Sequence, residues 1–434
     1  WKGDSNNQML QRITGHAFKS EEDLKTFLET LAAAQERDHR KLGKELQLFQ
    51  FDELSPGSPI ILPKGTIVYN ELLRFLREQY RQRGYQEVIT PQMFNKTLWE
   101  QSGHWQHYKE NMFVLPVDNT EFALKPMNCP SHLLIYNSTI HSYRDLPLRI
   151  ADFCFLHRNE VRGTLGGMTR VRKMSQDDSH IFLTMDQIET EIARMLDFVR
   201  YVYTNVFKFP FSLELSTRPE KALGDAQLWE KAEQILKNSL EQSKLPYKIS
   251  AGEGAFYGPK IDIHLQDALG RSHQCATIQL DFQLPLKFNA TYEGQDGKKH
   301  SVIMIHRTVL GSLERFMGII TEHFAGKFPL WLSPVQVKLI TVADKHIPFA
   351  KEVYDQLFAA GIRVALNDKP ETLPKKVRDA ELEHCNFIVT IGDKELEKKT
   401  LAVRPRGKNV QFGVQLDAFV KDLQEKISTR ALDA

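Results

Sequence analysis

Alternation of apolar and polar residues in the middle of the chain constrains the fold more than any other feature of the sequence. Ile261, Ile263 and Leu265 show the pattern first, and the segments HQCATIQLDFQL and SVIMIHR repeat it. A period of two is typical of β-strands with one buried face. Helices alternate with strands, as parallel sheets require, only after residue 335. We therefore predict an antiparallel sheet at the centre of the protein.

The stretch from His157 to His180 carries the densest group of functional side chains. It predicts a strand, a glycine-rich loop and a second strand. Arg158 and Glu160 alternate and so share a face, where a guanidinium can hold a phosphate and a carboxylate can accept a hydrogen bond from an amine. The second half adds Arg170 and Arg172, followed by Gln176, Asp178 and His180 at a spacing of two. The alternative is a solvated polar hairpin without a ligand.

Composition excludes several classes of protein. The 434 residues suggest two or three domains, and 57 basic against 55 acidic residues leave a formal charge of +2, so any RNA-binding surface must be a local patch. The four cysteines stand singly, which argues against a disulfide framework or a four-cysteine zinc site and favours a reducing compartment. No apolar run reaches 18 residues and no secretory signal is present, so we expect a cytoplasmic protein without membrane contact.

Helical periodicity and turn residues divide the chain into three parts. A helix is predicted from Ser20 to about Arg40, where Ser20 and Asp23 form a capping pair, and another over 69–80 that ends at Gly84. Helices are also expected at 185–207 and 226–242. After the linker PLWLSP, helices and strands alternate to the end of the chain. We predict a connector at 1–40, a main domain at 41–330 and an α/β domain at 335–434.

Four further positions are candidates for a site, and each has a simpler interpretation. His104 and Cys129 lie in polar clusters, but a histidine or a free cysteine is more often a structural residue. Lys260 follows a glycine-rich turn that lacks the order of a phosphate-binding loop. Arg315 lies near the start of a predicted helix, where anions are favoured.

Taken together, these segments resemble the threonyl-tRNA synthetases, a family of class II aminoacyl-tRNA synthetases. YQEVITP is similar to the first class II motif, HRNE through RVRKMSQDD to the second and GSLERF to the third. The threonyl family is indicated by NCP, QDDSH, GEGAFYGPK, QCATIQLDF and IHR. The resemblance implies an α+β catalytic domain with an antiparallel class II sheet and flanking helices, and a C-terminal α/β anticodon-binding domain with a mixed sheet.

The resemblance also implies a zinc ion, one per subunit, bound by Cys129, His180 and His306. These residues are 51 and 126 positions apart, so spacing alone could not have selected them. Three protein ligands leave an open position on a tetrahedral zinc ion. The family uses this position to bind the amino and hydroxyl groups of threonine, and Asp178 would accept a hydrogen bond from the same hydroxyl. Valine has no such hydroxyl.

Other roles follow from the same resemblance. ATP, bound with Mg²⁺, would contact Arg158, Glu160, Arg170, Gln274, Gln279 and Arg315. Threonine would lie against Met127, Asp178, Tyr257 and Gln279. Arg158, Arg315, Lys260 and His104 would support catalysis, with His104 near the terminal ribose of tRNA(Thr). Glu397 and Arg406 would read the anticodon. The region of the first motif would form a homodimer.

The sequence departs from the family pattern at Ser131, Met168, Met174 and Ser179, which puts inhibitor and tRNA contacts in doubt rather than activity. The family's N-terminal editing region is not in the sequence, so we expect serine to be mischarged, since one methyl group contributes only about 1–3 kcal/mol to discrimination. Three alternatives stay open: a paralogue that does not charge tRNA, a zinc hydrolase, and a non-catalytic RNA-binding module.

Overall fold

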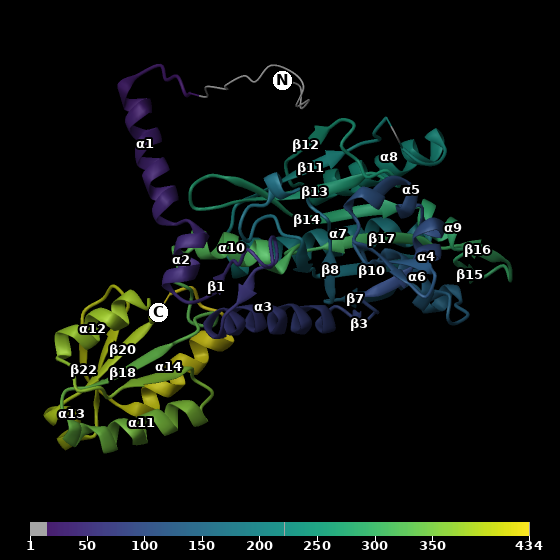
Figure 1. Ribbon diagram of the computed structural model, residues 1–434. Helices are drawn as coiled ribbons and strands as arrows, with labels where there is room; N and C mark the ends of the chain where they lie inside the picture. The colour runs from purple at the N-terminus through teal and green to yellow at the C-terminus, as the bar shows by residue number, and fades with distance from the viewer. Residues whose placement is uncertain (1–14, 221, 434) are drawn as a thin grey trace.

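The computed structural model describes residues 15–220 and 222–433 (Figure 1). Its largest hydrophobic core extends from Leu42 to Leu332 along the sequence. A second core contains Leu330 and the apolar residues between Val337 and Leu423. The C-terminal part therefore has an interior of its own.

The main sheet has eight strands in the order β12-β11-β13-β14-β17-β10-β7-β3. Its six inner strands are antiparallel, and each edge adds one parallel pair. The predicted antiparallel sheet is confirmed, and the parallel edge strands make the complete sheet mixed. The strands are β3 (Gln86–Glu87), β7 (Leu148–Asp152), β10 (Asp178–Leu183), β11 (Phe211–Ser216), β12 (Tyr247–Ser250), β13 (Lys260–Gln266), β14 (Ser272–Asp281) and β17 (Ile303–Thr308).

Helices pack their apolar sides against this sheet and bury the centre of the core. They are α3 (Pro63–Gln82), α7 (Ile188–Arg200), α8 (Ala226–Ser243) and α10 (Leu313–His323). The predicted helix at 185–207 continues past α7 as one π-helical segment, Tyr201–Val206. Ser312 caps α10 by accepting a hydrogen bond from the N–H of Arg315. Gly311 precedes this cap with φ of +71°, a conformation that favours glycine.

The predicted connector helix is two helices. α1 (Glu21–Glu36) begins at Ser20, whose hydroxyl accepts from the N–H of Asp23, and α2 (His39–Glu45) begins at Asp38, which accepts from the N–H of Arg40. The prediction is confirmed at its start, with Ser20 as the cap, but the helix ends at Glu36 and the cap at Asp38 begins a second helix. α1 has no buried residue and extends away from the rest of the molecule, whereas α2 packs against α10 (Figure 1).

The hairpin at 157–180 is confirmed in outline but has shorter strands than predicted. β8 (Phe155–His157) pairs with β9 (Lys173–Ser175), so Arg158, Glu160 and Arg170 lie in the loop between them. The N–H of Arg158 still donates to the carbonyl oxygen of Arg172. The N–H of Arg172 donates to Gly57 in a neighbouring loop, which ends the strand pairing there.

Shorter elements complete the main domain. A three-stranded sheet has the order β4-β6-β5, and two-stranded sheets pair β1 with β2 and β15 with β16. These elements are β1 (Phe49–Gln50), β2 (Ile60–Ile61), β4 (Met93–Asn95), β5 (Val114–Val117), β6 (Thr120–Leu124), β15 (Thr291–Glu293), β16 (Lys299–Ser301), α4 (Lys96–Ser102), α5 (His104–Tyr108), α6 (Cys129–Tyr136) and α9 (Gln283–Lys287).

The C-terminal part has a five-stranded sheet in the order β19-β18-β20-β21-β22. β19, β18 and β20 are parallel to one another, β21 is antiparallel to β20, and β22 is antiparallel to β21. This arrangement confirms the predicted mixed α/β sheet. Its elements are β18 (Val337–Thr341), α11 (Ile347–Ala359), β19 (Val364–Asn367), α12 (Leu373–Leu382), β20 (Phe387–Ile391), α13 (Asp393–Lys398), β21 (Leu401–Pro405), β22 (Gln411–Val414) and α14 (Leu416–Ser428). Among the helices of residues 15–220 and 222–433, none is long and apolar enough to cross a bilayer.

Candidate active site

Cys129, His180 and His306 meet at the centre of the main sheet. Their ligand atoms all lie within 4.8 Å of one another, and all three residues are buried. Nε2 of His180 lies 3.0 Å from Nδ1 of His306. Two nitrogen ligands on a tetrahedral zinc ion are separated by about 3.3 Å, so the two rings are nearly in place. One thiol and two imidazoles are a donor set that suits zinc.

Strand register explains why distant parts of the chain meet here. His180 of β10 is directly paired with His306 of β17, His306 with Gln279 of β14, and Gln279 with Lys260 of β13. Paired residues share one face of a sheet. The four side chains therefore form a row across the sheet, and Cys129 joins the row from the start of α6.

The two histidines have partners on the sides of their rings that face away from each other. Nδ1 of His180 shares a hydrogen bond of 2.8 Å with Nδ1 of His132. Nε2 of His306 is 2.9 Å from the carboxylate of Asp281. Such outer partners fix the orientation of histidines that bind a metal. His132 is itself buried. Its Nε2 lies 3.8 Å from the carboxylate of Asp152, which is an electrostatic contact and not a hydrogen bond.

Burial controls the protonation of this group. It raises the pKa of the Cys129 thiol, and the nearby carboxylates of Asp178 and Asp281 raise it further. Burial also lowers the pKa of His180, which keeps its imidazole neutral. The neutral imidazole of His180 is ready to bind a metal, whereas the thiol of Cys129 must release a proton when a metal binds.

The residues predicted to bind the amino acid surround this group. The ring of Tyr257 stacks on His306 with 4.9 Å between centroids, and its hydroxyl donates a hydrogen bond to Gln279. Asp178 is buried and accepts a hydrogen bond of 3.1 Å from the side chain of Asn128. The pocket thus offers a carboxylate next to the candidate metal site.

His104 lies on the other side of Cys129. Its Nε2 is 3.3 Å from the sulfur of Met127 and 3.9 Å from Sγ of Cys129, and its Nδ1 is 2.8 Å from the hydroxyl of Ser102. Burial lowers the pKa of His104 to about 3, so the ring is neutral at physiological pH. A pKa this low makes the ring a weak base, so it suits a hydrogen bond better than proton transfer.

A cavity of about 890 Å³ adjoins the group of Cys129, His180 and His306. All six residues predicted to bind ATP line this cavity. They are Arg158, Glu160, Arg170, Gln274, Gln279 and Arg315. Gln279 belongs to both the cavity and the row across the sheet, so the two parts of the site are continuous.

The cations of the cavity differ in how they are paired. Among the described residues, neither Arg158 nor Arg315 forms an ion pair, and Nε of Arg315 has no hydrogen-bond partner. Arg170 forms an ion pair of 2.8 Å with Glu160. Lys260, which belongs to the row across the sheet and not to the cavity lining, lies 2.7 Å from Asp262. The two unpaired guanidinium groups are therefore available to an anion such as a phosphate.

A second acid and histidine group, Asp38, His39 and Glu322, lies at the edge of the cavity. Its candidate ligand atoms are already used. Asp38 pairs with Arg40 at 2.6 Å, and Glu322 accepts hydrogen bonds from His39 and Arg271. Two guanidinium groups beside these carboxylates do not suit a cation, so we do not regard this group as a metal site.

The two residues predicted to read the anticodon are placed differently from each other. Glu397 is exposed on α13. Arg406 is partly buried and donates hydrogen bonds to the carbonyl oxygens of His384, Lys327 and Phe328 at the junction of the two cores. These bonds give the guanidinium of Arg406 a structural role, and its role in RNA binding stays a prediction.

Several residues of the site were missed from the sequence. His132 follows Cys129 by three positions on α6, a helical spacing that could have revealed it. Asp281 follows Gln279 by two positions on β14 and so shares its face. The four departures from the family pattern are buried: Met168 and Met174 in apolar contacts, and Ser131 and Ser179 with their hydroxyl groups bonded to backbone carbonyl groups.

Comparison with known proteins agrees with this geometry. Residues 113–324 match the tRNA synthetase class II core domain (G, H, P, S and T), and residues 336–426 match the anticodon binding domain. The chain is similar to the threonine–tRNA ligase of Clostridioides difficile (strain 630), with 50% identity over 99% of this chain and 67% of that protein. The Thermotoga neapolitana threonine–tRNA ligase is 50% identical over 100% of this chain and 68% of that protein.

Solved structures give the same result. The RNA binding domain of threonyl-tRNA synthetase from Cryptosporidium parvum Iowa II has a TM-score of 0.87 and 45% identity, covering 89% of this chain and 98% of that chain. A putative threonyl-tRNA synthetase from Aeropyrum pernix has a TM-score of 0.79 and 27% identity, covering 91% and 97%. The protein therefore belongs to the threonine–tRNA ligase family of class II aminoacyl-tRNA synthetases, with a class II core followed by an anticodon-binding domain.

Proposed function

We propose that this protein activates L-threonine with ATP and transfers it to the 3′ end of tRNA(Thr). The observation that carries the proposal is the convergence of Cys129, His180 and His306 beside a cavity with two unpaired arginines. A threonine carboxylate oxygen would attack the α-phosphorus of ATP, which releases pyrophosphate and leaves threonyl-adenylate. The terminal ribose hydroxyl of the tRNA would then attack the carbonyl carbon and release AMP.

The zinc ion would be held by Cys129, His180 and His306. When bound, zinc supplies an open coordination position for the amino and hydroxyl groups of threonine. Asp178 would accept a hydrogen bond from that hydroxyl. A site built to bind a hydroxyl rejects an analogue without it by about 10⁴-fold, which an apolar pocket cannot do. Tyr257, Gln279 and Met127 would enclose the rest of the amino acid.

The cavity residues would position ATP and stabilise its charge. Arg158 and Arg315 would neutralise the phosphates together with Mg²⁺, and Gln274 and Arg170 would lie around the nucleotide. Lys260 would support catalysis from the neighbouring row across the sheet. Glu160 would accept from the adenine amine after its ion pair with Arg170 opens. Neutral His104 would lie near the terminal ribose and accept a hydrogen bond from its hydroxyl during transfer.

We also propose three features of the whole molecule. The chain would divide into a connector at 1–40, a catalytic domain at 41–330 and an anticodon-binding domain at 335–434, in which Glu397 and Arg406 would contact RNA. It would act in the cytoplasm. It would form a homodimer through the region of Ile89, an apolar residue that is 85% exposed in the monomer. Sedimentation of the wild type and of Ile89→Asp would test the dimer.

The test of the reaction is threonine-dependent exchange of pyrophosphate into ATP, combined with metal analysis. The wild type should contain one zinc ion per chain and show exchange with threonine that is about 10⁴-fold above that with valine. Cys129→Ser should lose both zinc and exchange. Cys385→Ser, a change at a buried cysteine of the C-terminal core, is the matched control and should keep both. A wild type without zinc, or Cys129→Ser with normal zinc content, would contradict the proposal.

A further inference from the structure

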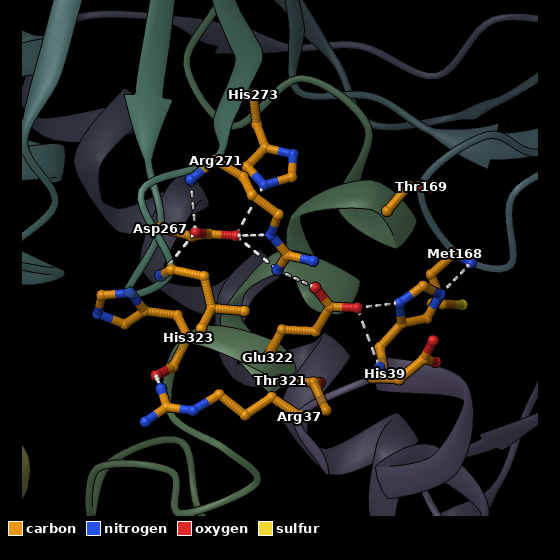
Figure 2. A network of polar contacts seen from close by, with 12 residues as sticks. Arg37, His39, Met168, Thr169, Asp267, Arg271, His273, Thr321, Glu322 and His323 are labelled. Atoms are coloured by element: carbon orange, nitrogen blue, oxygen red, sulfur yellow. Dashed lines mark hydrogen bonds and ion pairs between the residues drawn. The ribbon is translucent and has the colours of Figure 1, made fainter. Parts of the chain in front are cut away.

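His39 of α2 connects a loop of the ATP cavity to the rest of the protein. The residue is buried, and its backbone N–H and its Nδ1 lie 3.0 Å and 2.6 Å from one carboxylate oxygen of Glu322 on α10 (Figure 2). Its Nε2 accepts a hydrogen bond of 3.0 Å from the backbone N–H of Met168. Met168 is in the loop between β8 and β9. The three contacts use both ring nitrogens.

The neighbours of His39 fix its tautomer. Burial opposes the charge of Glu322, but hydrogen bonds from His39 and Arg271 outweigh burial and lower the pKa of Glu322. Glu322 is therefore an acceptor, so Nδ1 of His39 carries the hydrogen and Nε2 has a free lone pair for Met168. Arg271 is held in turn by Asp267, which also contacts His273 (Figure 2). The network joins α2, α10 and the turn between β13 and β14.

The hydrogen bond from Met168 to His39 is important for the order of the loop. Gly163, Gly166 and Gly167 give its backbone unusual freedom, and ordering that backbone costs entropy. Within the described residues, every other hydrogen bond from the backbone N–H groups of residues 161–170 stays inside the loop. At the two ends of the loop, the N–H groups of Asn159 and Arg172 donate to Asn111 and Gly57. Within residues 161–170, the bond from Met168 to His39 is therefore the hydrogen bond that ties the backbone to another part of the structure.

Close packing against α2 and α10 also holds the loop at Gly167 and Met168. A side chain at Gly167, where φ is +60°, would place its Cβ 2.3 Å from Nε2 of His39. A side chain at Gly318 of α10 would place its Cβ 2.9 Å from Cβ of Met168. The loop residues next to this point, Gly166, Thr169 and Arg170, line the ATP cavity. The position of Met168 therefore sets the position of one cavity wall.

We propose that His39 is a positioning residue for ATP: it holds the loop of residues 161–170 in the conformation that forms the ATP cavity. The inference rests on the proposed function, because it assumes that ATP binds in this cavity. His39 lies at the edge of the cavity, and we assign its effect to its bonds with Met168 and Glu322 and not to a contact with the nucleotide. Loss of its bond should therefore weaken ATP binding and leave threonine binding unchanged.

Two substitutions at His39 separate its two contacts. His39→Asn keeps a donor near Nδ1 for Glu322 but has no acceptor that reaches Met168. His39→Gln is longer and can present its oxygen to the Met168 N–H. In threonine-dependent pyrophosphate exchange, His39→Asn should raise KM for ATP about fivefold, equivalent to about 1 kcal/mol for one hydrogen bond, with kcat and KM for threonine within twofold. His39→Gln should restore KM for ATP to within about twofold of the wild type.

His346 in the C-terminal core provides the matched control. It is also buried, accepts a backbone N–H from Ala343 through one ring nitrogen and contacts Asp393 through the other. His346→Asn should leave the KM for ATP unchanged. Hydrogen exchange of the wild type gives an independent readout, because the Met168 amide should exchange more slowly than the amides of Gly163 and Gly167.

The two proposals fail in different ways. If the wild type shows no threonine-dependent exchange, the proposed function is wrong. If the wild type is active and His39→Asn keeps the wild-type KM for ATP, the inference about His39 is wrong. A His39→Asn protein that only melts earlier, with no change in KM for ATP, would also overturn it. If that variant does not fold, an unprotected Met168 amide in the wild type would overturn the inference by itself.

Discussion

Asp177→Asn is the substitution that most directly tests how the active-site strands are fixed. Asp177 is buried just before β10, and its carboxylate accepts hydrogen bonds from the backbone N–H groups of Val309, Leu310 and Gly311 at 2.8, 3.0 and 2.7 Å. These residues connect β17, which carries His306, to α10, which carries Arg315. One carboxylate therefore holds the connection, residues 309–311, between the strand of His306 and the helix of Arg315.

The expected loss follows from the donors around this carboxylate. The hydroxyl of Tyr80 is a fourth donor, and the buried guanidinium of Arg307 lies 4.4 Å above the Tyr80 ring. Asparagine replaces one acceptor oxygen by a donor, so at least one buried N–H loses its partner, a cost of about 1–3 kcal/mol. The negative charge that compensates Arg307 also disappears. We expect a total loss of about 3–5 kcal/mol in the free energy of unfolding.

Urea unfolding followed by tryptophan fluorescence measures this loss in the part of the protein that contains Asp177. All five tryptophans precede residue 335, and Trp331 lies in the main core, so the signal does not come from the C-terminal sheet. Asp296→Asn is the control, because Asp296 caps an exposed turn by accepting from the N–H of Lys298, and its urea midpoint should stay at the wild-type value. A loss below about 1 kcal/mol for Asp177→Asn would refute the idea that this carboxylate fixes the connection between β17 and α10.

Three further substitutions test other parts of the structure. Burial lowers the pKa of His323, so the unfolded chain binds a proton more readily and the wild type should lose stability as the pH falls from 7.5 through 6.5. His323→Asn should reduce this loss, measured as the difference in Tm between pH 7.5 and 5.5. Arg406→Ala removes hydrogen bonds to three backbone carbonyl groups at the domain junction and should lower stability by about 1–2 kcal/mol, with faster proteolysis near residues 327–335 and unchanged pyrophosphate exchange. Lys125→Met leaves the buried carboxylate of Asp152 without its cation and should cost about 3–5 kcal/mol, seen as a lower Tm.

The sequence predicted the sheet well because its signal is local. β13 buries Ile261, Ile263 and Leu265, and β14 buries Ala276, Ile278 and Leu280. This alternation of apolar residues can be read without knowledge of the strand's partners. The strand lengths of the hairpin were less predictable. Arg172 donates to Gly57, a residue more than a hundred positions earlier, and no local pattern indicates where such a partner interrupts the pairing.

The candidate site was predicted through family resemblance and not through spacing. His180 and His306 are adjacent because β10 lies beside β17 in a register that aligns them, and neither the strand order nor the register is written in a local pattern. His39 illustrates the same limit. It lies in a polar segment, DHRK, and its partners Met168 and Glu322 are 129 and 283 positions away.

The two parts of the site are held in place by different means, and this difference predicts how substitutions will act. The row from Lys260 to His180 lies on neighbouring strands whose backbone ladders fix the side chains relative to one another. One wall of the cavity proposed for ATP is a glycine-rich loop, and residues 161–170 of this loop are tied to the core by the bond from Met168 to His39. Substitutions behind the sheet, such as Asp177→Asn, should therefore weaken folding together with activity. Substitutions behind the loop should change KM for ATP while the protein remains folded.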